Sequence, residues 1–127
     1  MFKVIIAGTR SFDDYELLKA KMDRLLSQQR DVEIVSGTAR GADQLGERYA
    51  VERGLPIKQF PADWNTYGKS AGYRRNAEMA EYADAAVVFW DGKSRGSKHM
   101  IDLAKRKGIA VRVIVYKKDM EELYERS

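Results

Sequence analysis

Three short segments of the chain combine glycines with arginine, hydroxyl or carboxylate side chains. They read Gly8-Thr9-Arg10-Ser11, Ser36-Gly37-Thr38-Ala39-Arg40-Gly41-Ala42-Asp43 and Asp91-Gly92-Lys93-Ser94-Arg95-Gly96-Ser97. Glycine allows backbone N–H groups to approach a ligand closely, and arginine binds phosphate through two parallel hydrogen bonds. The second and third segments each lead into a helical segment, whose N-terminus attracts anions. Together these residue types predict a phosphate-binding site.

A fourth segment, Arg74-Arg75-Asn76, opens another helical stretch. An arginine here can bind phosphate, and an asparagine can hydrogen-bond to a ribose hydroxyl or to the edge of a base. Neighbouring residues on a helix point about 100° apart. We therefore expect one arginine of the pair to face the site and the other, Arg74, to face solvent.

The ligand-binding residues predicted from these four segments are glycines, hydroxyl residues, arginines and three other polar residues: Gly8, Thr9, Arg10, Ser36, Gly37, Thr38, Arg40, Gly41, Asp43, Arg75, Asn76, Asp91, Gly96 and Ser97. Structural alternatives stay open for several of them. The glycines can serve tight turns only, Asp43 can cap the helix that follows it, and Asp91 can cap its own turn.

Aromatic residues and the one histidine lie close to these segments. Trp64, Tyr67 and Tyr73 are candidates for stacking on a base, whereas Trp90 at a strand end is expected in the core. His99 lies within a helical segment, where a lone histidine is more often a packing or surface residue than a catalyst.

Five short runs rich in β-branched or aromatic residues predict the strands that position these segments. They are residues 4–7, 32–35, 57–60, 86–90 and 111–115. Apolar residues recur at helical spacing between these runs, around residues 17–26, 45–50, 77–83 and 101–104, and after the last run at residues 120–124. The alternation predicts an α/β fold, a Rossmann-like three-layer α/β/α domain over residues 1–127. Its mainly parallel sheet has about five strands with the first in the middle, and ligands bind beyond their carboxyl ends.

Three local signals refine this prediction. Asp13 with Glu16 indicates the start of the first helix. Gly54 and Gly108 indicate helix ends, because glycine adopts the left-handed conformation that closes a helix. Residues 61–69 are expected to form one long loop.

Composition excludes several classes of site. The 127 residues contain no cysteine and one histidine, so thiol chemistry, thiolate metal sites and a histidine-rich metal centre are excluded, and we expect no metal and no cofactor. The first residues form too short an apolar run for a signal peptide or a membrane span, so we expect a cytoplasmic protein without membrane contact. The net charge of +4 is compatible with an anionic ligand and equally with an ordinary basic surface.

The same glycine and arginine segments resemble the SLOG superfamily. The residues that carry the resemblance are Gly8-Thr9-Arg10 with Phe12-Asp13, the segment from Ser36 to Asp43, Tyr73 to Ala80, and Gly96-Ser97. That superfamily includes the cytokinin-activating LOG phosphoribohydrolases, the DNA-processing protein A family and the YspA-like proteins, and the chain resembles the small YspA-like branch most. The resemblance implies a Rossmann-like fold whose glycine loops surround a nucleotide or a nucleotide-derived signal.

One position departs from the LOG pattern. LOG enzymes carry a glycine-rich motif ending in a glutamate that performs acid–base work on the N-glycosidic bond, and Met100 stands where that glutamate would be. A thioether cannot transfer protons. No catalytic residue is therefore assigned.

Three functions remain open. The favoured one is binding of a nucleotide-derived molecule, for sensing or sequestration. The second is a hydrolase that cleaves a nucleoside monophosphate or a related glycoside with Asp43, Glu78 or Asp91 in place of the missing glutamate. The third, less favoured, is binding of single-stranded nucleic acid, because the aromatic residues form no regular series interleaved with basic ones. A homo-oligomer stays open.

Overall fold

The computed structural model describes residues 1–116, which are built around a parallel sheet. Its five strands are β1 (Phe2–Gly8), β2 (Val32–Ser36), β3 (Ile57–Gln59), β4 (Ala85–Trp90) and β5 (Ala110–Val115), in the order β3-β2-β1-β4-β5. Every neighbouring pair is parallel, with Val4 opposite both Ile34 of β2 and Ala85 of β4. The predicted Rossmann-like fold with β1 in the middle is confirmed.

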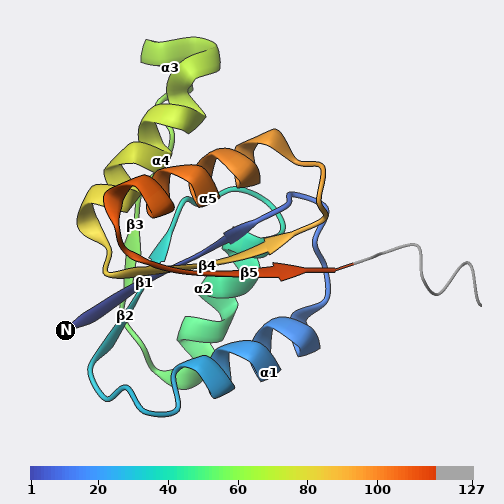
Figure 1. The fold of residues 1–127 in the computed structure, drawn as a ribbon, viewed down its shortest axis with the longest axis vertical. Coiled ribbons are helices and arrows are strands. Elements are labelled where there is room, and N and C mark those ends of the chain that lie inside the picture. Colours follow the sequence, from blue (N-terminus) through green and yellow to red (C-terminus); the bar gives the residue numbers. More distant parts are fainter. Residues whose placement is uncertain (117–127) are drawn as a thin grey trace, which may run out of the picture.

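Helices cover both faces of the sheet (Figure 1). α1 (Tyr15–Leu25) and α2 (Ala42–Arg53) lie on one face, and α4 (Ala71–Tyr82) and α5 (Arg95–Lys107) lie on the other. Parallel strands need such crossover helices, which place a hydrophobic layer on each side of the sheet. The result is the three-layer arrangement that the sequence predicts.

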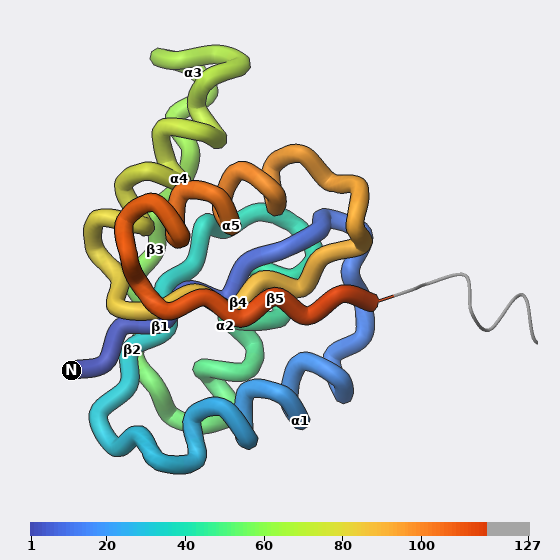
Figure 2. Tube along the Cα trace, in the orientation of Figure 1, coloured from blue at the N-terminus to red at the C-terminus, as the bar shows by residue number. Residues whose placement is uncertain are grey.

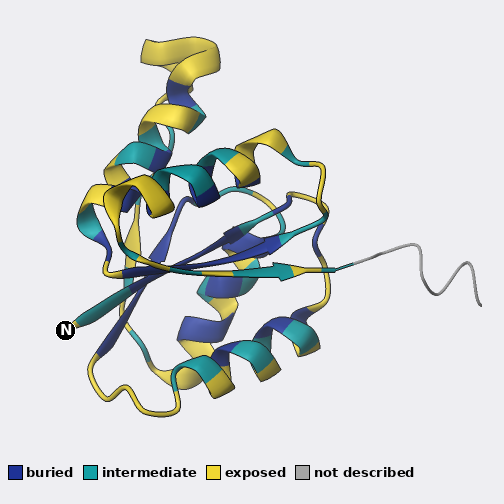
Figure 3. Cartoon of the chain, viewed as in Figure 1, coloured by how far each residue is buried: buried dark blue, intermediate teal, exposed yellow. Residues whose placement is uncertain are grey.

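Two separate hydrophobic cores follow from this arrangement (Figure 3). Leu18 and Met22 of α1 and Tyr49 of α2 pack against one face of the sheet. Met79 of α4 and Met100 of α5 pack against the other face. The central strands are buried on both faces, as expected for nearly continuous apolar runs in a parallel sheet.

The ends of the helices mostly agree with the glycine signals. Gly54 ends α2 and Gly108 ends α5, both in the left-handed conformation. The start of α1 was predicted one residue too early, because the side chain that caps it belongs to Asp14 and accepts a hydrogen bond from the Leu17 N–H group. Two adjacent aspartates precede this helix, and spacing alone favoured Asp13.

The expected long loop after β3 is partly helical. α3 (Trp64–Tyr67) begins after Asp63, whose side chain accepts a hydrogen bond from the Thr66 N–H group, and a 3₁₀ turn, η1 (Gly68–Ser70), continues into α4. In the tube view these residues project beyond the body of the molecule (Figure 2). Residues 64–70 are called the arm below.

Two further expectations concern the chain outside these layers. The short helix predicted at residues 120–124 lies outside the described residues. Within residues 1–116, the helices are too short or too polar to cross a membrane.

Candidate functional site

The site lies at the point where the order of strand addition reverses, between β1 and β4. From β1 the chain adds β2 and β3 on one side, and then returns to add β4 and β5 on the other. The loops that follow β1 and β4 therefore diverge and leave a hollow at the carboxyl ends of these strands, the usual position of ligands in such sheets. A pocket of about 430 Å³ occupies this position and is called the switch-point pocket.

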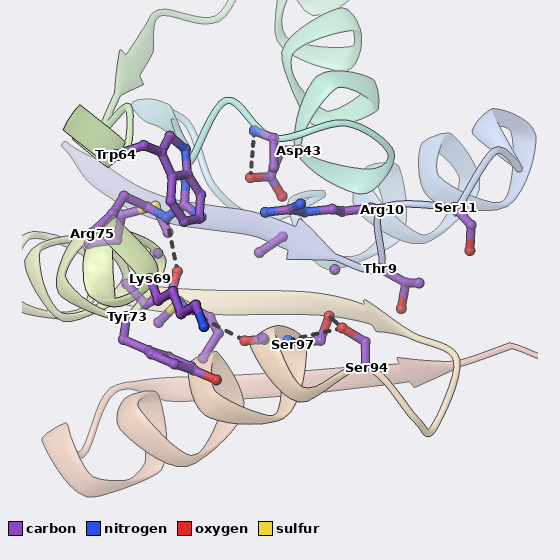
Figure 4. Close-up of a pocket in the computed structure, with 18 residues that line it drawn as sticks. Thr9, Arg10, Ser11, Asp43, Trp64, Lys69, Tyr73, Arg75, Ser94 and Ser97 are labelled. Carbon is purple, nitrogen blue, oxygen red and sulfur yellow. Dashed lines mark hydrogen bonds between the residues drawn. The ribbon is translucent and has the colours of Figure 1, made fainter. Parts of the chain in front are cut away.

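Four parts of the chain form the wall of the switch-point pocket (Figure 4). The lining residues come from the end of β1 and its loop, from the start of α2, from the arm with α4, and from the start of α5: Ala7, Gly8, Thr9, Arg10, Ser11, Ala39, Asp43, Trp64, Lys69, Gly72, Tyr73, Arg75, Asn76, Met79, Ser94, Gly96, Ser97 and Met100. The N-terminal turns of α2 and α5 both contribute, and their backbone dipoles favour an anion between them.

Arg75 and Arg74 have opposite surroundings, as the helical spacing predicts. Arg75 is partly buried, lines the pocket, and donates hydrogen bonds to the Gly37 carbonyl and to Asn76 Oδ1 (3.1 Å). Arg74 is exposed, and its guanidinium lies 4.3 Å from the centre of the Tyr67 ring. Arg75 is therefore the arginine of the pair that faces the site.

Asp43 is a buried carboxylate in the wall of the switch-point pocket. Its side chain is 4% exposed, and Oδ2 accepts a hydrogen bond from the Ala39 N–H group at 3.2 Å. Burial raises the pKa of the Asp43 carboxyl from 3.8 to about 6, although the Ala39 N–H group and the Arg75 charge act in the opposite direction. Asp43 thus holds the preceding loop in place, and the cap of α2 itself is Gly41.

The loop between β2 and α2 is held in an unusual conformation. Thr38 has a φ angle of 65°, which is unfavourable for a β-branched residue. Ser36 Oγ accepts from the Thr38 N–H group (3.1 Å) and donates to Glu47 Oε2 (2.6 Å), so α2 anchors the loop. Backbone strain that is stabilised in this way is characteristic of functional sites.

Gly41 explains how closely the loop after β2 approaches the loop after β1. Its φ angle is 79°, and a Cβ atom there would lie 2.5 Å from the Arg10 carbonyl oxygen. Only glycine fits this conformation and this contact. Gly41 therefore lets the loop after β2 pack directly on the loop after β1.

The side chain of Asn76 connects α4 to α5. Its Nδ2 atom lies 3.4 Å from the Gly96 carbonyl oxygen, to which it donates, and 3.2 Å from His99 Nδ1. His99 packs edge-on against the Tyr73 ring, with 4.4 Å between ring centres, and burial lowers its pKa. His99 is thus a packing residue, as expected, and Asn76 lines the pocket while fixing the start of α5.

The loop after β4 is tied to the loop after β1. Thr9 Oγ1 accepts a hydrogen bond from the Asp91 N–H group at 3.1 Å. Asp91 Oδ1 accepts from the Lys93 and Ser94 N–H groups, both at 2.8 Å. Burial opposes ionisation of Asp91, but these N–H groups lower the pKa of its carboxyl overall. Asp91 therefore caps its own turn, the alternative that the sequence left open.

A second hollow adjoins the switch-point pocket. It has a volume of about 390 Å³ and is called the arginine pocket, because three arginines line it, together with the loop after β2 and the chain leading to the arm: Arg10, Gly37, Thr38, Ala39, Arg40, Pro61, Ala62, Trp64 and Arg75. Arg10, Ala39, Trp64 and Arg75 line both pockets and form the wall that they share.

The structure brings most of the predicted site residues to these two pockets. The switch-point pocket contains Gly8, Thr9, Arg10, Asp43, Arg75, Asn76, Gly96 and Ser97, and the arginine pocket adds Gly37, Thr38 and Arg40. Ser36, Gly41 and Asp91 line neither pocket, because they hold the surrounding loops. Three polar lining residues, Ser11, Lys69 and Ser94, were not predicted to bind ligand, although Ser11 and Ser94 lie within the segments that the sequence singles out.

Met100 lines the switch-point pocket from α5 and is 1% exposed. It belongs to the hydrophobic core under α4 and α5. Among the lining residues of the switch-point pocket, Asp43 is the only carboxylate. Within residues 1–116, no group of three or more histidine, cysteine, aspartate or glutamate side chains is placed to hold a metal ion.

Comparison with known proteins agrees with the sequence resemblance. The sequence model of the YspA, cpYpsA-related SLOG family matches residues 2–67. The chain is also similar to the Gene 61 protein of Mycobacterium phage D29, with 35% identity over 118 residues, which covers 87% of this chain and 94% of that protein.

Two solved structures share the fold. DNA processing protein A from Streptococcus pneumoniae is similar with a TM-score of 0.74 and 18% identity, over 100% of this chain and 57% of that chain. The chain therefore spans little more than half the length of that protein. DNA processing protein A from Helicobacter pylori, which binds single-stranded DNA, is similar with a TM-score of 0.68 and 22% identity, over 98% of this chain and 72% of that chain.

Proposed function

Because the chain belongs to the YspA, cpYpsA-related SLOG family, we propose that it binds a nucleotide or a nucleotide-derived phosphate, for sensing or sequestration, in the switch-point pocket. The observation that carries this proposal is the placement of two arginines, Arg10 and Arg75, beside the N-terminal turns of two long helices. Arginine matches phosphate with two parallel hydrogen bonds, and a helix N-terminus offers it free backbone N–H groups.

The pocket also has the size and the side chains for the rest of a nucleotide. A volume of about 430 Å³ lies in the range of small-molecule sites. Trp64 and Tyr73 offer aromatic faces at its rim, and Ser94 and Ser97 offer hydroxyl groups on the side of α5. A phosphate beside the arginines and a base beside the aromatic rings is the arrangement that we infer.

Hydrolysis of an N-glycosidic bond has less support. Such a reaction generally uses two carboxyl groups, or a carboxyl group and a base, placed on either side of the bond. In the switch-point pocket Asp43 stands alone among the carboxylates, and Met100 occupies the position of the LOG glutamate. Binding without turnover is therefore the function that we propose.

The neighbouring arginines of α4 provide a matched test. Calorimetry should compare adenosine 5′-monophosphate with adenosine for the wild-type chain and for Arg75→Ala and Arg74→Ala. We expect Arg75→Ala to weaken binding of the nucleotide by about 1.5–3 kcal/mol, the scale of a charge-assisted hydrogen bond. Binding of the nucleoside should change much less, and Arg74→Ala should change neither.

The contrary results are also clear. Equal losses for nucleotide and nucleoside would assign Arg75 to folding alone. Equal losses from Arg75→Ala and Arg74→Ala would show a general effect of surface charge, and either result would remove the support for a phosphate site at Arg75.

A further inference from the structure

The structure contains a second hollow that a single nucleotide in the switch-point pocket leaves unfilled. The arginine pocket has nearly the same volume, about 390 Å³ against about 430 Å³. Each is large enough for one nucleotide. The two hollows are not independent, because Arg10, Ala39, Trp64 and Arg75 line both of them.

The charge of the arginine pocket indicates what it binds. Arg10, Arg40 and Arg75 line it, and none of the described residues in its wall is acidic. Burial lowers the pKa of Arg75, the neighbouring Asp43 carboxylate opposes this shift, and the Arg10 charge acts in the same direction as burial. An anion placed between these cations relieves their repulsion, and phosphate matches the planar guanidinium group.

Trp64 provides a surface for a base on the wall between the pockets. Its side chain is 50% exposed, and the Arg10 guanidinium lies 5.9 Å from its ring centre. In Figure 4 the Arg10 side chain extends across the pocket toward Trp64. Exposing half of an indole costs free energy, and stacking with a base recovers part of it.

Within residues 1–116, the other exposed aromatic rings lie in the same region. Tyr67 and Tyr73 are 45% and 46% exposed, and they lie in and just after the arm. Arg74 covers the Tyr67 ring, and Lys69 of the arm lines the switch-point pocket. The basic and aromatic residues that show no regular series in the sequence therefore come together in the folded chain, around the two pockets.

From these contacts we infer that the ligand is a unit of two nucleotides joined by a phosphodiester, one nucleotide in each pocket, with Trp64 stacking at the junction. This inference rests on the proposed function for the first nucleotide and adds the arginine pocket for the second. Arg40 is the specificity residue that follows from it, because Arg40 lines the arginine pocket and not the switch-point pocket.

The test compares thymidine 5′-monophosphate with 5′-phosphorylated dithymidylate by calorimetry. We expect the dinucleotide to bind about tenfold tighter or more, since a second charge-assisted contact is gained. Arg40→Ala should weaken the dinucleotide about tenfold and the mononucleotide less than about twofold. Arg24→Ala, which removes the same charge from an exposed position on α1, should change neither.

A second variant and a longer probe complete the design. Trp64→Ala should weaken the dinucleotide about tenfold while thermal unfolding keeps its midpoint, because the side chain is exposed. Decathymidylate separates the two sources of a dinucleotide unit. The decamer offers nine overlapping dinucleotide positions, so a gain in affinity well above about tenfold over the dinucleotide supports a single strand as the source, and a smaller gain or none supports a free dinucleotide.

Failure of the inference differs from failure of the proposed function. If the mononucleotide and the dinucleotide bind equally, or if Arg40→Ala weakens both alike, the arginine pocket is not a second nucleotide site. If the mononucleotide does not bind, or if Arg75→Ala leaves its affinity unchanged, the proposed function fails. Arg40-dependent binding of the dinucleotide would still support the arginine pocket.

Discussion

Asp43 and Arg75 meet over the backbone of Gly37. A Cβ atom on Gly37 would lie 2.7 Å from Asp43 Oδ2 and 2.8 Å from Arg75 Nη1. The absence of a side chain at residue 37 is thus what allows a carboxylate from α2 and a guanidinium from α4 to approach the same loop. Arg75 completes the arrangement by donating a hydrogen bond to the Gly37 carbonyl.

Gly37→Ala should therefore impair nucleotide binding. The added methyl group displaces Arg75 and Asp43, and we expect about a tenfold or greater loss of affinity, since displacing a charge-assisted contact costs about 1.5–3 kcal/mol. Calorimetry with adenosine 5′-monophosphate measures the loss. Ser27→Ala is the control, because Ser27 is exposed, follows the end of α1 and lines neither pocket. Similar affinities of the two variants would contradict the role given to Gly37.

The stability of the protein should depend on the protonation of Asp43. The folded chain raises the pKa of this carboxyl from 3.8 to about 6. Between these values the folded state holds a proton that the unfolded state has lost, so the free energy of unfolding falls as pH rises. From about pH 4 to about pH 7 this group should lower it by about 2 kcal/mol.

Asp43→Asn isolates this contribution. Asparagine is neutral throughout and still offers an oxygen to the Ala39 N–H group, so the variant should lack this part of the pH dependence. Urea unfolding at several pH values measures both proteins. Parallel curves for the wild type and the variant would show that Asp43 does not titrate in this range.

The wild-type chain should bind adenosine 5′-monophosphate without releasing adenine. Met100 cannot transfer protons, and Asp43 is the only carboxylate that lines the switch-point pocket. Chromatography of the reaction mixture detects free adenine, and turnover near about 1 s⁻¹, an ordinary enzyme rate, would contradict this expectation.

Met100→Glu should fail to restore hydrolysis and should lower the midpoint of thermal unfolding. Its side chain would replace one that is 1% exposed in the core under α4 and α5. A carboxylate buried there without a cationic partner costs several kcal/mol. Unchanged thermal stability would show that the new carboxyl group turns into the pocket and reaches water.

A hydrogen bond far from the site should contribute to stability alone. Tyr49 of α2 is 3% exposed, and its hydroxyl donates to Asp23 Oδ1 at 2.7 Å. Tyr49→Phe should lower the free energy of unfolding by about 1 kcal/mol without a change in nucleotide affinity. Tyr67→Phe on the exposed arm should lower it by less than about 0.5 kcal/mol. Equal effects of both substitutions in urea unfolding would contradict this contribution of the hydroxyl.

The sequence predicts the sheet well because burial on both faces leaves a strong local pattern. The run Ala86-Val87-Val88-Phe89-Trp90 can be recognised without its neighbours, and the structure extends it by one residue. The arm could not be predicted in this way. α3 spans Trp64–Tyr67, about one turn, which is too short for a helical period, and its start depends on the single cap Asp63.

For the site, the sequence predicts where the loops lie but not which of their side chains face the pockets. The glycine and arginine segments lie at the carboxyl edge of the sheet, as the sequence predicts, because parallel strands bring all such loops together. Which side chain of a loop turns inward depends on backbone angles that the sequence does not reveal. Ser36 and Asp91 illustrate this, since both turn toward backbone N–H groups of their own loops and line neither pocket.

The sheet order has a consequence for the nascent chain. β1 is made first, yet one of its two partners is β4, with Val4 opposite Ala85, and the wall of the switch-point pocket extends from Ala7 to Met100. A ribosome must release most of the chain before the pocket can close, so one edge of the central strand β1 stays unpaired until β4 has been made. A ligand held in the pocket stabilises only the completed sheet. The concentration of that ligand during synthesis would then set how often the pairing of β1 with β4, once formed, opens again.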